Sequence, residues 1–534
     1  MGNTPLGVAN FASANGIEAL SLGYEPCNVG STNVSYAAGT PNHPVYGSSL
    51  YRLKTVDGTL RIEEVGQSWL RHGFFALSQG LRCTCTPTDG TQLGTGCSDS
   101  LSAGGGAGTT GWGPRWQVDA TTGVFTFPPA NPPHSGLDRL LQVHVADLEP
   151  TGSAGAARYF AEVQTVAADD ASAGNGDNNS SHCEIAVAGS ASAWTFAVIG
   201  GTNEVERPAI YAWQDADPGV MVSDVSVASD GRFLLASRAT DLGGGLWHYE
   251  YALHNQSSDR SAQSFYVPVP YFGNVSNIGF HDVDYHSGDG PGNVNFDGTD
   301  WSVAMPFGAV VFSTDTFATN PSGNAVRWGT TYNFRFDSDI PPFNATVTVG
   351  LFEPGTPGDV QIPAVVPFLA PPPPFFSYCW GDGSAGPCPC ANAGGGGRGC
   401  QNSAGTGGAL LFGYGNASLS ADSVTFESSG ELPTALTIVM QATTMISPVN
   451  FGDGLRCVNG TIKRLYVKSA SGGVAAAPAQ GDPSITARSA ALGDPIQAGE
   501  RRYYQTYYRD SNPSYCPAPQ GNTFNASHVV KIVW

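Results

Sequence analysis

The chain has 534 residues, of which 13% are charged, 41% are hydrophobic and 69 are glycine. Its formal net charge of −20 repels phosphate backbones and anionic lipids, which argues against binding to nucleic acid or to an acidic membrane surface. Few charged residues and many small, turn-forming ones disfavour exposed helices. We therefore predict a mostly β fold of several antiparallel β-sandwich-like domains with long Gly/Ser/Asn-rich loops.

The first predicted domain, residues 1–195, is β-rich and carries disulfide-bearing loops. Residues 68–77 are compatible with a short helix. The loop at 80–120 is long and holds three cysteines, and cross-linking suffices to explain its length. Strand-like runs occur at 59–65, 123–127, 140–145 and 159–166.

The second predicted domain, residues 196–353, is a β-sandwich. Residues 246–254 alternate apolar and polar side chains, which places Tyr249 and Tyr251 on one face of a strand and His248 and Glu250 on the other. Runs at 264–269, 301–305 and 332–336 behave in the same way. The sequence then predicts a Pro-rich linker at 354–375 and a Cys-rich β module at 376–534.

None of the eleven cysteines forms the Cys-x-x-Cys motif of a redox protein. Six of them lie in the tail, which indicates three disulfides in an oxidising compartment. Five precede the linker, so one of them is left over, and whether Cys183 is that free thiol stays open. No segment predicts a membrane span. We expect disulfides, of undetermined pairing, among Cys27, Cys83, Cys85, Cys97, Cys379, Cys388, Cys390, Cys400, Cys457 and Cys516.

Asp282, Asp284 and His286 are the strongest candidates for a site. On a strand, alternate residues share a face, so two carboxylates and an imidazole could bind a divalent cation. Three interpretations stay open for this face: a solvated outer surface of the sandwich, a structural metal site, or a catalytic centre. The sequence contains no recognised catalytic motif, so we predict no catalytic residue, and the balance is against an enzyme.

Two loops rich in carboxylate and amide oxygens are candidate calcium sites, and calcium is the only cofactor we predict. The first loop contains Asp169, Asp170 and Asp177, and the second contains Asp297. Loops built from ordinary Asx turns explain the same residues. Five tryptophans, which would line a carbohydrate platform or belong to the core, are Trp112, Trp116, Trp213, Trp247 and Trp301.

Segments 67–77, 96–99, 169–176, 247–251 and 278–286 resemble secreted β-rich proteins of planctomycetes and similar environmental bacteria. The tail resembles a recurrent Cys-rich C-terminal surface module of those bacteria. The segments that carry this second resemblance are 381–384, 388–390, 399–402, 451–457 and 529–534. The resemblance implies a location and a class of protein and no characterised activity.

These observations predict a secreted or cell-surface protein of structural or adhesive function. Its expected partners are a second copy of the chain or a surface polysaccharide. Two alternatives stay open. One is a secreted carbohydrate-active or metal-dependent hydrolase that uses Asp282, Asp284 and His286, and the other is a glycan-binding protein.

Overall fold

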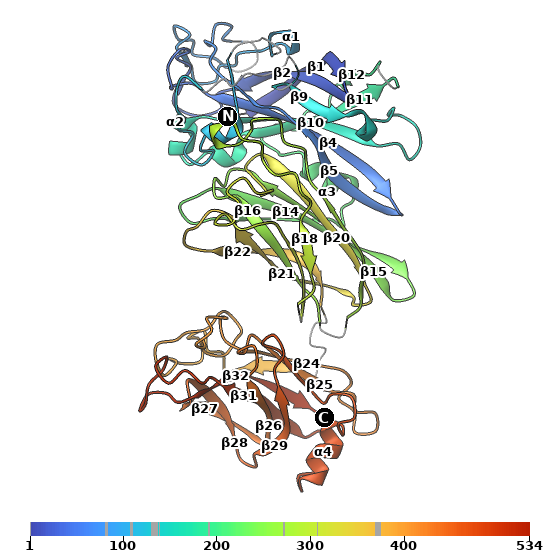
Figure 1. Cartoon of the computed structure of the whole chain (residues 1–534), viewed down its shortest axis with the longest axis vertical. Coiled ribbons are helices and arrows are strands. Elements are labelled where there is room, and N and C mark those ends of the chain that lie inside the picture. The colour runs from blue at the N-terminus through green and yellow to red at the C-terminus, as the bar shows by residue number, and fades with distance from the viewer. Residues whose placement is uncertain are drawn as a thin grey trace. The chain divides into compact units, whose positions relative to one another are not determined.

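The computed structural model confirms the predicted class, because its elements are strands in antiparallel sheets with a few short helices (Figure 1). The chain forms two compact units, one of residues 1–304 and 310–368 and one of 305–309 and 369–534. None of the helices in the described part of the chain has the length and hydropathy of a membrane-spanning segment. The structure describes residues 2–80, 84–106, 111–129, 137, 139–190, 193–270, 273–306, 308–368 and 375–534.

A ten-stranded sheet begins the first unit, with the strand order β1-β2-β9-β5-β4-β10-β11-β12, β6 beside β4 and β8 beside β6. Short β3 (Val34–Ser35) and β7 (Gln92–Leu93) pair separately. The strands of the large sheet are β1 (Gly2–Ala14), β2 (Ile17–Cys27), β4 (Val45–Val56), β5 (Thr59–Gln67), β6 (Leu70–Arg71), β8 (Trp112–Gly113), β9 (Leu141–His144), β10 (Arg158–Val166), β11 (Ser180–Ala188) and β12 (Thr195–Val198).

The helix predicted at 68–77 is wrong. Only Leu70–Arg71 is regular there, and it is strand β6. The backbone amides of this segment bond to distant residues: Ser68 to the Ser48 carbonyl at 2.9 Å and His72 to the Gly111 carbonyl at 2.6 Å. These long-range partners replace the bonds between residues four apart that a helix needs. The run at 123–127 forms one bridge to Val118 rather than a strand.

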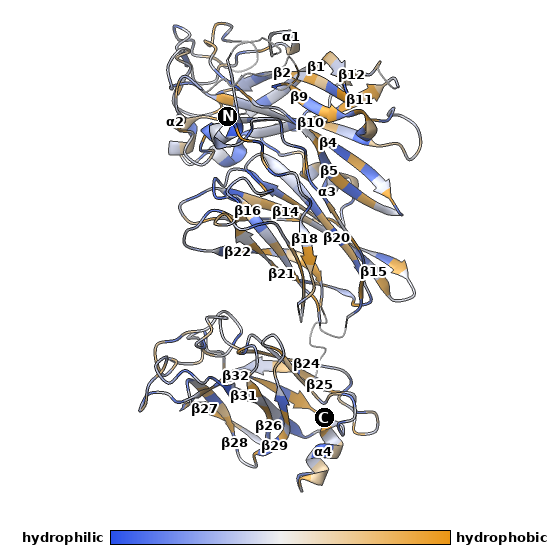
Figure 2. Ribbon diagram, in the orientation of Figure 1, coloured by the Kyte–Doolittle hydropathy of each residue, from blue (hydrophilic) through white to orange (hydrophobic). Residues whose placement is uncertain are grey.

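Two five-stranded sheets form the sandwich that the alternating strands predicted. The first has the order β13-β14-β15-β20-β17 and the second the order β18-β19-β16-β21-β22. Figure 2 shows hydrophobic and hydrophilic residues along the same strands. The strands are β13 (Met221–Ser226), β14 (Arg232–Gly243), β15 (Leu246–Asn255), β16 (Ala262–Pro268), β17 (Val275–His281), β18 (Ser302–Ala304), β19 (Ala309–Ser313), β20 (Thr330–Ser338), β21 (Pro342–Leu351) and β22 (Asp359–Pro367).

The first sheet of the sandwich is covered on both faces. One face joins the second sheet in a core that contains Tyr251, Phe265 and Phe334. On the other face, Leu234 and Ala252 cluster with residues of β4, β5 and β10 and with helix α3 (Tyr211–Ala216). The first unit therefore stacks three β layers, and the sheet in the middle packs on both of its faces.

The second unit contains a five-stranded sheet, β23-β32-β31-β26-β29, and a three-stranded sheet, β24-β25-β30, that share one apolar core. β22, which pairs with β21 of the sandwich, lies inside the stretch predicted as a linker, and 369–374 lie outside the described residues. The strands are β23 (Phe376–Tyr378), β24 (Leu410–Tyr414), β25 (Thr425–Ser429), β26 (Leu436–Ala442), β27 (Thr444–Phe451), β28 (Gly454–Asn459), β29 (Lys463–Ser469), β30 (Ala475–Ala477), β31 (Arg501–Arg509) and β32 (Phe524–Val533). The remaining helices of the chain are α1 (Ala103–Gly106), α2 (Ala168–Ser172), α4 (Ile485–Ala491) and the 3-10 turns η1 (Arg115–Gln117), η2 (Val145–Asp147), η3 (Gly176–Asn178) and η4 (Pro291–Asn293).

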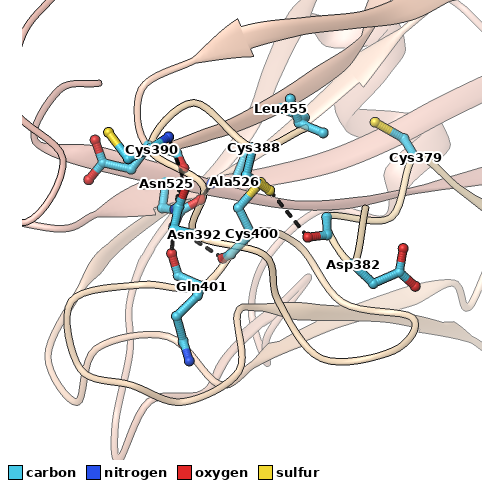
Figure 3. The surroundings of a disulfide bond; sticks show 12 residues. Cys379, Asp382, Cys388, Cys390, Asn392, Cys400, Gln401, Leu455, Asn525 and Ala526 are labelled. Atoms are coloured by element: carbon cyan, nitrogen blue, oxygen red, sulfur yellow. Dashed lines mark hydrogen bonds between the residues drawn. A yellow bond between two sulfur atoms is a disulfide. The ribbon is translucent and has the colours of Figure 1, made fainter. Parts of the chain in front are cut away.

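Disulfides join all six cysteines of the tail. The backbone around Cys400 is held further by Asn525, whose Nδ2 donates to the Cys400 carbonyl at 3.2 Å (Figure 3). In the first unit Cys27 is disulfide-bonded and Cys183 is free and buried, while Cys83 lies outside the described residues. The pairs within the described residues are Cys85–Cys97, Cys379–Cys457, Cys388–Cys400 and Cys390–Cys516.

Candidate binding cavity

The three residues at 282–286 do not share a strand face, because β17 ends at His281. The Asp282 carboxylate accepts a hydrogen bond from Asn324 Nδ2 at 2.5 Å. Exposed Asp284 pairs with His144 at 2.8 Å. Buried His286 donates from Nε2 to the Gln67 carbonyl at 2.7 Å. Each side chain therefore has its own protein partner, and the three do not converge on one point.

The candidate calcium loops also bond to the protein itself. Asp169, beside Asp170 in α2, accepts from the Ser35 amide at 2.7 Å. Asp177 lies 3.3 Å from an Arg232 nitrogen. Asp297 accepts from the Thr299 amide at 2.9 Å and from Asn320 Nδ2 at 3.2 Å. Within the described ranges, no group of three or more His, Cys, Asp or Glu is placed to hold a metal ion, so calcium binding stays a prediction.

The polar face of β15 is buried between two layers. His248 Nδ1 lies 2.6 Å from Asp337 and His248 Nε2 lies 3.1 Å from Glu250. Although burial acts in the opposite direction, these two hydrogen bonds raise the pKa of His248. Arg61 of β5 approaches Glu250 within 3.2 Å. This ionic network joins the ten-stranded sheet to the sandwich, and it offers no open position for a ligand.

A cavity of about 110 Å³ lies in the first unit, where the end of β5 and turn η1 meet loops of the sandwich. Those loops follow β15, β17 and β21 and precede β20. The cavity is lined by five aromatic residues, Trp69, Trp116, Tyr285, Phe296 and Trp328. Five charged residues also line it: Arg115, Asp259, Asp289, Arg327 and Glu353. This mixture of apolar surface and a few polar groups is typical of a small-molecule site.

Buried and partly buried hydrogen bonds fix one wall of the cavity. Arg115 donates to the carbonyls of Ser68 at 2.9 Å and of Gly329 and Ser48 at 3.2 Å each. Gly329 has a φ of +76°, and a β-carbon there would come within 2.0 Å of an Arg115 nitrogen. Asp289 accepts hydrogen bonds from the Trp69 indole and from the His286 amide. These side chains hold the wall of the cavity, and they can contact a ligand only if their hydrogen bonds to the wall break.

The remaining charged groups are available for binding. Asp259 is exposed, Glu353 is half-buried, and among the described residues no hydrogen bond or ion pair engages either side-chain carboxylate. Desolvation, and then the charges of Asp119, Glu353 and Asp230, raise the pKa of Asp259 to about 7, although the residue as a whole is exposed. Desolvation also raises the pKa of Glu353.

Two donors of the cavity lining also have no partner in the described part of the chain. They are the buried Nε of Arg327 and the buried indole Nε1 of Trp328. Trp328 is only 4% exposed, so water does not easily satisfy its N–H. A buried donor without an acceptor costs about 1–3 kcal/mol. Both atoms are buried from solvent, so a ligand that brings acceptor oxygens to this wall would remove that cost once the wall moves to admit it.

The sequence predicted few of the residues that line this cavity. Of the five tryptophans proposed as a platform, only Trp116 lines it, and it is 36% exposed. Trp112, Trp213 and Trp301 are buried in other clusters. Trp247 lines another, more open hollow. The predicted platform is therefore not assembled, and no local pattern marks Asp259, Arg327 or Glu353.

No family model matches the chain, and no curated protein matches its sequence. Among solved structures, the serine-rich repeat adhesion glycoprotein Srr1 of Streptococcus agalactiae is similar at 8% identity and a TM-score of 0.18, over 66% of this chain and 89% of that one. The fimbrial adhesin FimA of Actinomyces is similar at 11% identity and a TM-score of 0.14, over 59% and 96%. At these scores the similarity carries no argument about function.

Proposed function

We propose that the chain is an extracellular adhesive protein that binds a saccharide in the cavity of its first unit. The cavity itself carries the proposal. It combines exposed Trp116 with two carboxylates and two donors that have no partner among the residues the structure describes. Sugars stack on aromatic faces and offer hydroxyl groups that both donate and accept hydrogen bonds. The cavity therefore matches the chemistry of a sugar ring on its apolar and polar sides.

The extracellular part of the proposal rests on covalent structure. Disulfides persist in oxidising compartments and are rare in the cytosol. Four are present among the described residues, three of them in the second unit. The adhesive role follows from placing a binding cavity on such a chain. A surface polysaccharide is the partner that we propose, and self-association stays a separate prediction.

The test is a binding screen of the full chain against immobilised oligosaccharides, with Trp116→Ala as the diagnostic variant. Trp380→Ala is the matched control, because Trp116 and Trp380 are each 36% exposed and Trp380 belongs to the second unit. We expect Trp116→Ala to lose at least tenfold in affinity and Trp380→Ala to bind like the native chain. Equal binding by both variants, or no binding to any saccharide, would refute the proposal.

One observation favours a second function, a glycoside hydrolase. Asp259 and Glu353 are two carboxyl groups in one aromatic cavity, and the pKa of Asp259 is raised to about 7. Glycosidases use such a pair as acid and as base or nucleophile. Hydrolysis of oligosaccharides by the native chain, abolished in Asp259→Asn and Glu353→Gln, would establish this function in place of simple adhesion.

A further inference from the structure

We infer that the cavity selects a sugar with a free amino group, whose ammonium lies between Asp259 and Glu353. The inference rests on the proposed saccharide function and names the class of sugar. Asp259 and Glu353 line the cavity, and the charges of Asp119, Glu353 and Asp230 act on Asp259.

Two of these four carboxylates hold their own loops. Asp119 accepts from the amides of Thr121 at 2.9 Å and Thr122 at 3.0 Å. Asp230 accepts from the Thr121 hydroxyl at 3.1 Å and from the Ser258 hydroxyl. The other two, Asp259 and Glu353, have no side-chain partner among the described residues, so they are the groups left to face a ligand.

The arginines beside these carboxylates direct their donors elsewhere. Arg327 donates to the Gly323 carbonyl at 3.0 Å, and its guanidinium carbon lies 3.6 Å from the centre of the Phe296 ring. Arg260 donates to the main-chain carbonyls of Glu353 at 2.9 Å and Pro357 at 2.8 Å. Five carboxyl groups therefore outnumber three guanidinium groups around the cavity: Asp119, Asp230, Asp259, Asp289 and Glu353 against Arg115, Arg260 and Arg327. A positive charge on the ligand would relieve this imbalance, whereas an anionic sugar would increase it.

The unpartnered donors distinguish an amino sugar from a lysine side chain. Trp328 Nε1 and Arg327 Nε are buried in the same lining and need acceptor oxygens. Ring hydroxyls of an amino sugar supply such oxygens next to the ammonium. The four methylenes beside a lysine ammonium supply none. The volume of about 110 Å³ admits one ring or its edge, so we expect the cavity to recognise a single residue of a longer chain.

The experiment is calorimetric titration of the full chain at pH 6.5 with three β-1,4-linked oligomers of equal length. They consist of glucosamine, N-acetylglucosamine and glucose. We expect the glucosamine oligomer to bind at least tenfold more tightly than the other two. Asp259→Asn and Glu353→Gln should remove this preference. Asp359→Asn, an exposed carboxylate of the same unit outside the cavity lining, should keep it.

The outcomes distinguish the amino-sugar inference from the saccharide function on which it rests. Equal affinity for the three oligomers, still lost in Trp116→Ala, would refute the amino-sugar inference and leave the saccharide function in place. Absence of binding to all three would refute both. Tighter binding of a lysine oligomer than of the glucosamine oligomer, or binding of calcium alone that depends on Asp259 and Glu353, would also overturn the inference.

Discussion

The two units of the chain are both built from antiparallel sheets, but they are stabilised in different ways. The first stacks three β layers around extended apolar clusters and buries ionic groups between two of them. The second has a smaller core and closes three loops with disulfides whose partners are 12, 78 and 126 residues apart. Size explains the contrast, since a smaller domain buries a smaller fraction of its surface and gains more from covalent links.

Polar groups also have different roles in the two units. In the first unit, polar side chains lie between layers and around a cavity, where they respond to pH and to ligands. In the second, the backbone near Cys388–Cys400 is bonded by the Asn392 and Asn525 side chains, which hold the chain in one arrangement (Figure 3). We therefore expect reduction to affect chiefly the second unit, and pH and saccharide to affect the first.

Reduction should give the largest effect. Each disulfide of the second unit contributes about 2–4 kcal/mol, and loss of all three should unfold this unit at 37 °C. The sandwich core of the first unit contains no disulfide among its described residues and should persist. Hydrogen exchange with and without reductant measures both, segment by segment. If reductant accelerates hydrogen exchange equally at 246–255 in the first unit and at 501–509 in the second, the two units do not differ in this way.

Glu64 should make the first unit less stable as pH rises. Burial raises the pKa of Glu64 from its usual 4.5 to about 8, although its carboxylate accepts from the Thr331 amide at 2.6 Å. The folded state then binds more protons than the unfolded state, so the free energy of unfolding falls between about pH 4.5 and pH 8. From pH 5 to pH 9, Glu64→Gln should gain on the order of 4 kcal/mol relative to the native chain.

Glu63, the neighbouring residue, is the matched control for Glu64. Burial acts in the opposite direction, but the charges of His281 and Arg52 hold the pKa of Glu63 below its usual value. Glu63 therefore contributes stability that is present above its unfolded pKa and is lost as pH falls through the lower folded pKa. Glu63→Gln should be less stable than the native chain at neutral pH. Urea unfolding across this range measures both variants, and the same sign for both would contradict our assignment.

Substitutions of single cysteines should have the smallest effects on stability, and they compare the two units directly. Cys183 is buried and free, and burial raises the pKa of its thiol to about 12, so it is an inert apolar residue. Cys183→Ala removes only one sulfur atom from the core and should cost about 1 kcal/mol. Cys400→Ala in the second unit should cost about 2–4 kcal/mol because it opens a disulfide. Thermal unfolding of both variants tests this order.

Local patterns in the sequence predicted the strands of the sandwich but not the packing of its first sheet against the ten-stranded sheet. Alternation identified β15 and β20 because one face of each is apolar. The same pattern does not show that the polar face of β15 is buried, since its partner Arg61 lies almost 190 residues away in the chain. β1, rich in small residues, offered no contrast between its faces.

The cavity was harder to predict because its residues come from separate loops. Asp259, Arg327 and Glu353 follow or precede different strands. Only the pairing of β15 with β20, and the packing of the sheet that contains β21 against them, brings these loops together. The predicted group at 282–286 depended on a strand that ends one residue earlier. Residue types alone therefore indicated 282–286 and not the cavity.

The most direct test of the proposed function is hydrogen exchange of the full chain with an equimolar mixture of glucose, N-acetylglucosamine and glucosamine oligomers. The mixture makes the test independent of the amino-sugar inference. We predict slower exchange at 257–261, 289–296 and 327–330, around the cavity of the first unit. Trp116→Ala should lose this protection. Protection confined to 376–534, or none at 327–330, would contradict a saccharide site in the cavity.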